Sequence, residues 1–190
     1  MAFFDDLPAP EPAPPRRHHP WEPPEAELPG NVSIDTLVLG RNDQVAVAVT
    51  GMSAFSAGME IFLTARIRPS AGNPGEHLPG GPRDLAASRR SLRFGLQFSD
   101  GGKAIGSPGG GRRDRDSEPP GPVLYPFAGG GGPHSFISRW WTWPLPPAGP
   151  LDLVCEWPAF GIAESRIGID AQLILDAAGR GVRLWPENGG

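Results

Sequence analysis

The residues best suited to binding chemistry form a tryptophan cluster in the second half of the chain. The segment SRWWTWPLPP places Trp140, Trp141 and Trp143 next to Arg139, and CEWPAF adds Trp157. Alternate residues of a strand face opposite sides, so Arg139, Trp141 and Trp143 share one face and Trp140 lies on the other. An exposed face of this kind would form an aromatic platform for a sugar ring or a partner's proline, with Arg139 at its edge.

The same tryptophans also have a structural interpretation. In it, the C-terminal helix and Trp185 cover the second face of the strand, which gives a three-layer core. Tryptophan precedes proline at Trp143-Pro144, Trp157-Pro158 and Trp185-Pro186. Proline ends strands because it lacks an N–H donor, and its ring can stack on the neighbouring indole. Such a contact between tryptophan and proline needs no ligand. The sequence leaves both interpretations open.

The side-chain patterns that enzymes use are mostly missing. No GxSxG, HExxH, Walker-type or DxDxDG motif occurs, and the glycine runs at 109–111 and 129–132 lack the helix that follows a phosphate-binding loop. We therefore expect both glycine runs to be loops. Glu156 and Glu164 flank WPAFGIA, where a carboxylate pair could hydrolyse a glycoside, but a salt bridge or a cap is the favoured role. We predict a non-enzymatic protein without a cofactor.

The histidines and the single cysteine predict neither a metal site nor a disulfide. His18 and His19 lie in a proline-rich stretch, His77 in a Gly/Pro-rich loop, and His134 after a glycine run, so nothing holds them in ligand geometry. Cys155 has no cysteine partner, and we expect it to be a small core residue. The first ten residues carry acidic charge and no apolar run follows them, which predicts a cytoplasmic protein without a secretory signal.

Composition indicates which parts of the chain can fold. The 27 Gly and 25 Pro among 190 residues greatly exceed ordinary usage, with neither a Gly-X-Y period nor an apolar run of membrane-span length. They concentrate in residues 1–30, which we expect to be a disordered acidic tail, and in insertions at about 69–90 and 100–121. Residues 31–186 then form one domain. The net charge of −4 predicts no nucleic-acid and no membrane partner.

Alternation with period two predicts β-strands through most of that domain. The clearest strand is 59–67, where Met59 and Ile61 face one side while Glu60 and Phe62 face the other. A turn at GRND predicts a hairpin between two further strands. In total, strands are expected at 32–39, 44–50, 59–67, 92–98, 136–145, 151–157 and 165–169.

Only one segment has a helical pattern. Asp170 is a suitable N-cap for AQLILDAAGRG, in which Leu173, Ile174 and Ala177 share a face, and Gly179 or Gly181 can end the helix in the left-handed conformation. Roughly six to eight antiparallel strands followed by one helix predict a mainly β fold. We expect an antiparallel β-sandwich of immunoglobulin-like or jelly-roll topology with one C-terminal helix.

A distinctive motif runs through the second half of the chain. WWTWPLPPAGPL is followed by CEWPAFGI, and VLGRNDQVAVAVTGMSAF and LRFGLQFSDG precede it. Over roughly residues 30 to 186, this motif resembles a family of small uncharacterised proteins common in GC-rich actinobacteria. The resemblance implies a stand-alone cytoplasmic protein with no assigned activity and no catalytic residues to transfer.

Three functions are compatible with these features. The first is a binding module that contacts another protein through its loops, its tail or the Trp140–Trp143 strand. The second is a carbohydrate-binding or carbohydrate-acting sandwich with the tryptophans as a platform and the two glutamates as acid or base. The third is a homodimeric or otherwise oligomeric structural unit that hides a strand edge or an aromatic face between its copies.

Overall fold

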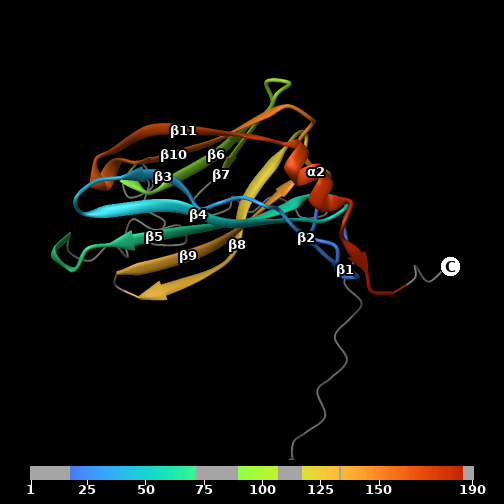
Figure 1. Ribbon diagram of the computed structural model, residues 1–190, viewed down its shortest axis with the longest axis horizontal. Coiled ribbons are helices and arrows are strands. Elements are labelled where there is room, and N and C mark those ends of the chain that lie inside the picture. The colour runs from blue at the N-terminus through green and yellow to red at the C-terminus, as the bar shows by residue number, and fades with distance from the viewer. Residues whose placement is uncertain (1–17, 72–89, 107–116, 133, 186–190) are drawn as a thin grey trace, which may run out of the picture.

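The computed structural model describes residues 18–71, 90–106, 117–132 and 134–185. Two antiparallel sheets face each other across a shared core, and one α-helix and a short ribbon lie at one end (Figure 1). This mainly β architecture with a helix near the C-terminus confirms the predicted β-sandwich class. Parts of the predicted tail (1–17) and of the two insertions (72–89 and 107–116) lie outside the described residues.

The larger sheet contains six strands in the described residues. Its order is β2-β4-β5-β9-β8, and β3 also pairs with β4. The side chains in the first half of β4 alternate between buried and more exposed positions, as expected for a strand with one face on a core. In β5 the outward Phe62 and Arg66 are more exposed than their neighbours, whereas the outward Glu60 and Thr64 are buried. The strands are β2 (Gly30–Asn31), β3 (Leu37–Arg41), β4 (Val45–Ala54), β5 (Met59–Ile67), β8 (Val123–Gly132) and β9 (Ser135–Trp143).

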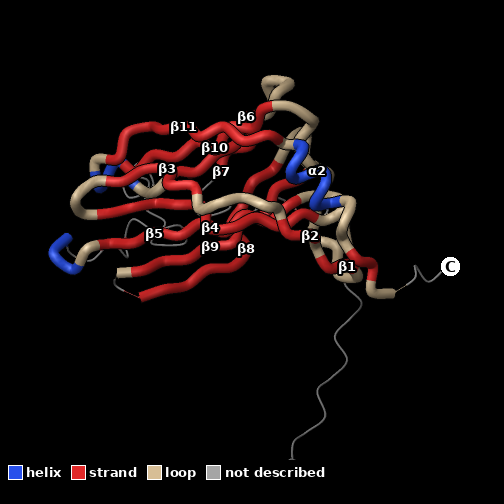
Figure 2. The backbone as a smooth tube through the Cα atoms, viewed as in Figure 1, coloured by secondary structure: helices blue, strands red, loops and turns tan. Residues whose placement is uncertain are grey.

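The smaller sheet has the order β11-β10-β6-β7, and the ribbon pairs β1 with β12. Figure 2 shows the two sheets as separate layers, with α2 at one end between them and the ribbon. The strands of the smaller sheet are β6 (Arg93–Gln97), β7 (Lys103–Gly106), β10 (Pro150–Trp157) and β11 (Ile162–Asp170). The remaining elements are β1 (Glu27–Leu28), β12 (Val182–Arg183), the α-helix α2 (Gln172–Ala178) and the 3-10 helices η1 (Pro69–Ala71) and η3 (Pro158–Phe160).

The space between the sheets is filled by the inward-facing side chains of both. Ile61 of β5 lies opposite Trp140 of β9, and Phe94 of β6 lies opposite Cys155 of β10. All four are buried. Ile174 of α2 is also fully buried in this core, so the helix closes one end of the sandwich. No helix of the described part of the chain has the length and apolar character needed to cross a bilayer.

Three segments expected to be loop or tail are strands. The glycine run 129–132 belongs to β8, where each glycine is paired with a residue of β9. Residues 103–106 of the predicted second insertion form β7, and residues 27–30 of the predicted tail contribute to β1 and β2. Pairing with an existing strand satisfies the backbone groups of these segments, and it overrides the low strand propensity of glycine.

The end of α2 also differs from the prediction. Gly179 has φ −65°, a right-handed conformation, and Gly181 is not among the glycines with positive φ. The chain leaves the helix through tight turns instead, in which the N–H groups of Arg180 and Gly181 bond to the carbonyls of Ala177 and Ala178. At the other end, Ala171 is the N-cap, and Asp170 accepts a hydrogen bond from the Gln172 N–H at 2.9 Å.

The close approach of β7 to the core gives a test of the packing. A Cβ at Gly106 would clash with the Trp140 ring and lie 2.8 Å from the Phe94 carbonyl oxygen. We expect Gly106→Ala to lower the free energy of unfolding by about 1–3 kcal/mol, because this core has no room for a methyl group. The measurement is urea denaturation followed by tryptophan fluorescence.

The matched control is Gly95→Ala in β6, where the nearest atom to an added Cβ is the Ala104 carbonyl oxygen at 3.4 Å. This variant should stay within about 0.5–1 kcal/mol of the wild type. Equal unfolding midpoints for Gly106→Ala and wild type would show that Trp140 is not packed against β7.

Candidate functional site

Three of the four tryptophans predicted to form a platform are fully buried. Trp140, Trp141 and Trp157 have 0% exposure. Trp140 lies between the sheets, edge-on to Phe94 with ring centroids 5.5 Å apart, and Trp157 packs edge-on against Phe160. A buried indole cannot stack on a ligand, so the prediction of an exposed platform is wrong for these three residues.

The layer that covers Trp141 comes from the N-terminal segment. The Trp141 indole N–H donates to the Trp21 carbonyl oxygen at 2.8 Å, and the Phe55 ring lies edge-on to it at 5.6 Å. Trp21 in turn contacts the half-buried Trp143, and His19 stacks on Trp21. The prediction that the C-terminal helix and Trp185 form this layer is therefore wrong.

Of the residues predicted for the platform, Arg139 is partly exposed at the surface. Its side chain contacts two aromatic rings and one carboxylate. Its guanidinium carbon lies 5.5 Å from the ring centroid of Phe62 and 4.9 Å from that of Phe127. Its Nη2 donates to Glu60 Oε2 at 2.5 Å. The side chain of Glu60 is only 5% exposed, against 43% for Arg139. Two rings and a buried carboxylate therefore hold this cation in place.

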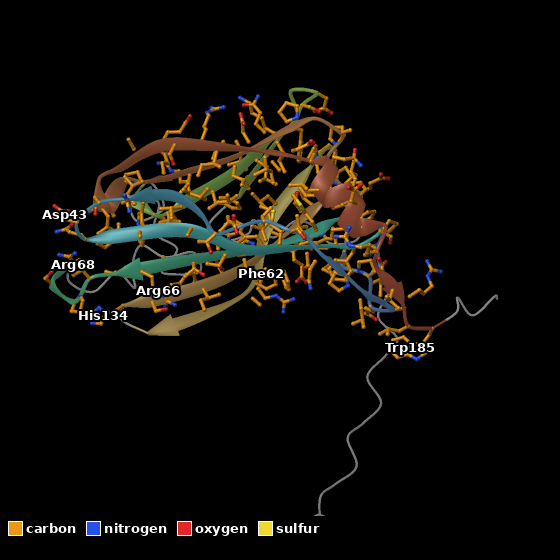
Figure 3. All side chains as sticks on the ribbon, in the orientation of Figure 1. Asp43, Phe62, Arg66, Arg68, His134 and Trp185 are labelled. Carbon is orange, nitrogen blue, oxygen red and sulfur yellow. The ribbon has the colours of Figure 1, made fainter. Side chains whose placement is uncertain are left out.

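Around Arg139, the side of the larger sheet that is turned away from the core is not covered by other described residues. Phe62 pairs with Arg139, and Thr64 pairs with Ile137, so their side chains share the side turned away from the core. Ile137 is 44% exposed although it sits in the middle of a strand. Figure 3 labels Phe62 and Arg66 along β5. We define the open face as the outward side chains of Val38, Phe62, Arg66, Phe127, Ile137 and Arg139.

The open face belongs to a sheet whose strands carry more positive than negative charge. Those strands contain Arg41, Arg66 and Arg139, and their one acidic residue, Glu60, is buried against Arg139. Arg41 and Arg66 both lie opposite Ala46 and so share the outward side, and Arg66 also bonds to the Ser135 hydroxyl. The whole chain has a net charge of −4, so this face differs in sign from the rest of the molecule.

The two glutamates considered as a catalytic pair are engaged elsewhere. Glu156 forms an ion pair with Arg93, and Glu164 forms one with Arg166 at 3.0 Å. Both pairs are at the surface, and both match the salt-bridge role favoured from the sequence.

The remaining candidate ligands are dispersed. His18 Nε2 lies 2.8 Å from the Pro23 carbonyl oxygen, and His134 is exposed beside the end of β9. His77 and glycines 109–111 lie outside the described residues. Within the ranges that the structure describes, no three His, Cys, Asp or Glu side chains are grouped so that they could hold a metal ion.

Only part of the open face follows from the sequence. The alternation in 59–67 already places Glu60 and Phe62 on the side opposite the core, and Arg139 was selected through its tryptophan neighbours. Phe127 and the exposed position of Ile137 were missed, because β8 was not recognised as a strand.

Comparisons with protein-family models, curated proteins and solved structures give no match for this chain. The resemblance to an actinobacterial family thus stays a prediction.

The contact between Glu60 and Arg139 can be tested by a double-mutant cycle. We expect Arg139→Met to lower the free energy of unfolding by about 1–3 kcal/mol, because it leaves the Glu60 carboxylate buried without a cation. The methionine retains apolar contact with the two rings. The double variant Glu60→Gln, Arg139→Met should be more stable than Arg139→Met alone. Strictly additive losses in urea denaturation would contradict the pairing.

Cys155 gives a second test of the interior. Burial, helped by the neighbouring Glu156 charge, raises the pKa of its thiol from 9.0 to about 12. At about pH 8 we expect the native thiol to be inert to a disulfide reagent and to react once the chain is unfolded, since the thiolate is the nucleophile. Rapid labelling of the folded chain would show that Cys155 is accessible.

The same shift predicts a pH dependence of stability. Because the pKa of the Cys155 thiol is raised in the folded state, its contribution to the free energy of unfolding is fully present below pH 9. This contribution is lost as the pH rises from 9 towards 12. Wild type should therefore lose more stability across that window than Cys155→Ala. Parallel pH profiles of the two proteins would contradict the assignment.

Proposed function

We propose that this chain is a non-enzymatic interaction module that binds another protein through the open face. The observation that carries the proposal is the position of Arg139, a partly exposed cation held between two aromatic rings and surrounded by exposed apolar side chains. Arginine and aromatic residues are enriched at the centres of protein interfaces. A cytoplasmic setting, expected from the single cysteine, belongs to the same proposal.

The rigidity of this site favours binding. Much of the free-energy cost of association comes from immobilising long side chains at the interface. Phe62, Phe127 and Glu60 already restrict the Arg139 guanidinium. A partner that contacts it therefore needs to order fewer rotamers than one that contacts a free surface arginine.

The charge of the face indicates the chemistry of the partner. Arg41, Arg66 and Arg139 face outward, and the carboxylate of Glu60 is buried. Electrostatic complementarity favours a partner that combines acidic with apolar side chains. The same argument disfavours a two-fold symmetric homodimer through this face, since the symmetry would place like charges opposite each other.

The carbohydrate alternative has little support. Stacking on a sugar ring needs an exposed aromatic ring, and three of the predicted platform tryptophans are in the core. Glu156 and Glu164 are paired with arginines. The tryptophan platform and the pair of glutamates on which this alternative was based therefore give it no support.

The proposal is tested by affinity capture from native lysate with matched variants. Ile137→Asp places a negative charge in the centre of the open face. Ile105→Asp makes the same change at an exposed position of β7, on the other sheet, where Ile105 is 75% exposed. We expect wild type and Ile105→Asp to retain the same protein and Ile137→Asp to lose it. Thermal unfolding checks that both variants are folded.

Two results would overturn the proposal. One is capture of the same protein by all three chains, which would move the interface away from this face. The other is the absence of any protein retained by wild type over a bead control.

A further inference from the structure

The open face is bordered by an unpaired strand edge. β8 is the last strand in the order of its sheet, and among the described strands it forms a ladder only with β9 (Figure 1). Its second half, 127–132, is exposed throughout. Half of the N–H and C=O groups of an edge strand point away from its one partner, so this stretch presents backbone groups that can bond to another strand.

This edge lacks the features that usually block strand addition. Proteins protect exposed edges with charged side chains, proline, bulges or a covering element. The last residues of β8 read Phe-Ala-Gly-Gly-Gly-Gly and contain neither charge nor proline. The bulge of this strand lies at Phe127, between Pro126 and Ala128, so the stretch without charge, proline or bulge is Ala128–Gly132.

The first half of β8 cannot pair with an added strand. Val123 and Leu124 are buried, and this part of β8 runs close to β7 of the other sheet. Pro126 has no N–H to donate. Any added strand is therefore confined to the stretch from Ala128 to Gly132.

The outward side beside that stretch is open. Gly130 pairs with Ile137, and Gly132 pairs with Ser135. A Cβ added at Gly130 or at Gly132 would meet no atom within 4 Å. On this outward side, residues 128–132 of β8 carry no side chain larger than the methyl group of Ala128. Side chains of a new strand can therefore reach Ile137 and Phe127.

We propose that β8 accepts an extended peptide of a partner protein as an added strand along Ala128–Gly132, and that this peptide carries acidic and apolar residues on the open face. This inference rests on the proposed function and names the binding mode and partner class. Strand addition takes its affinity from main-chain hydrogen bonds and its specificity from alternate side chains.

The side chains of the open face define the sequence preference. Apolar side chains of the peptide would pack on Phe127 and Ile137, both of which are exposed. Arg139 lies on β9, two strands from the added one and so about 10 Å away. An arginine and a glutamate side chain can together cross that distance. The charge on this face therefore selects acidic peptides over basic ones.

A second copy of the chain fits this edge less well. Pairing of two β8 edges would bring the arginines of two open faces together across the new ladder, which is unfavourable. It would also place two copies of the run 129–132 against each other, and that run has no side chains to pack.

The test is a selection of random peptides of about ten residues, displayed on phage, against the full chain. The matched variants are Gly130→Glu and Gly121→Glu. An added Cβ meets no atom within 4 Å at either position, and both substitutions change the charge by the same amount. Gly121 lies just before β8, outside the proposed edge.

We expect the selected peptides to alternate apolar and acidic residues and to bind Gly121→Glu as they bind wild type. Gly130→Glu should weaken binding about ten-fold or more, because its carboxylate repels an acidic strand. Hydrogen exchange should show slower exchange of backbone amides within 128–132 when a synthetic selected peptide is bound. Thermal unfolding verifies that Gly130→Glu is folded.

Other outcomes overturn the inference and separate it from the proposed function. Peptides without acidic residues, equal binding to Gly130→Glu, or protection of amides elsewhere would each exclude acidic strand addition at β8. If selection fails while capture from lysate still depends on Ile137, strand addition is wrong and the open face stays the interface. If neither experiment gives binding, both proposals are wrong.

Discussion

The packing of Trp140 between the two sheets is the contact on which the rest of the structure depends. Its ring is fully buried edge-on to Phe94, its indole N–H donates to the Ser138 hydroxyl at 2.8 Å, and Gly106 of β7 approaches it closely. Because successive residues of a strand face opposite sides, placing Trp140 inward forces Arg139 and Trp141 outward. The candidate site is thus a direct consequence of how β9 meets the core.

The sequence predicts well those strands that have one face on the core. The alternation in 59–67 and 151–157 gives the bounds of β5 and β10 closely, since apolar residues repeat on the side that faces the core. It fails where pairing rather than burial stabilises a strand. Glycines 129–132 have no side chains to alternate, and β7 lies within a segment rich in glycine and proline. Their strand structure comes from pairing with β9 and β6, the neighbouring strands along the chain, and not from a pattern of buried side chains.

The N-terminal segment shows a second limit of prediction from the sequence. Proline content correctly argues against regular structure around Trp21, yet this segment is ordered by tertiary contacts with Trp141 and Trp143. A single hydrogen bond and one aromatic contact, each across more than a hundred residues, leave no trace in local propensity. The two-faced tryptophan pattern did indicate that a covering layer was needed. It could not indicate which part of the chain supplies it.

The pair formed by Glu60 and Arg139 is better explained by binding than by stability. Burying a carboxylate carries a desolvation cost that its cation often only offsets, and apolar residues of similar size serve a core as well or better. The pair is also imperfect, because Arg139 Nε is buried without a hydrogen-bond partner. An arrangement selected for stability alone would place an apolar residue at position 60. What the carboxylate does provide is a fixed, partly exposed cation between Phe62 and Phe127, on a face that also carries exposed apolar side chains.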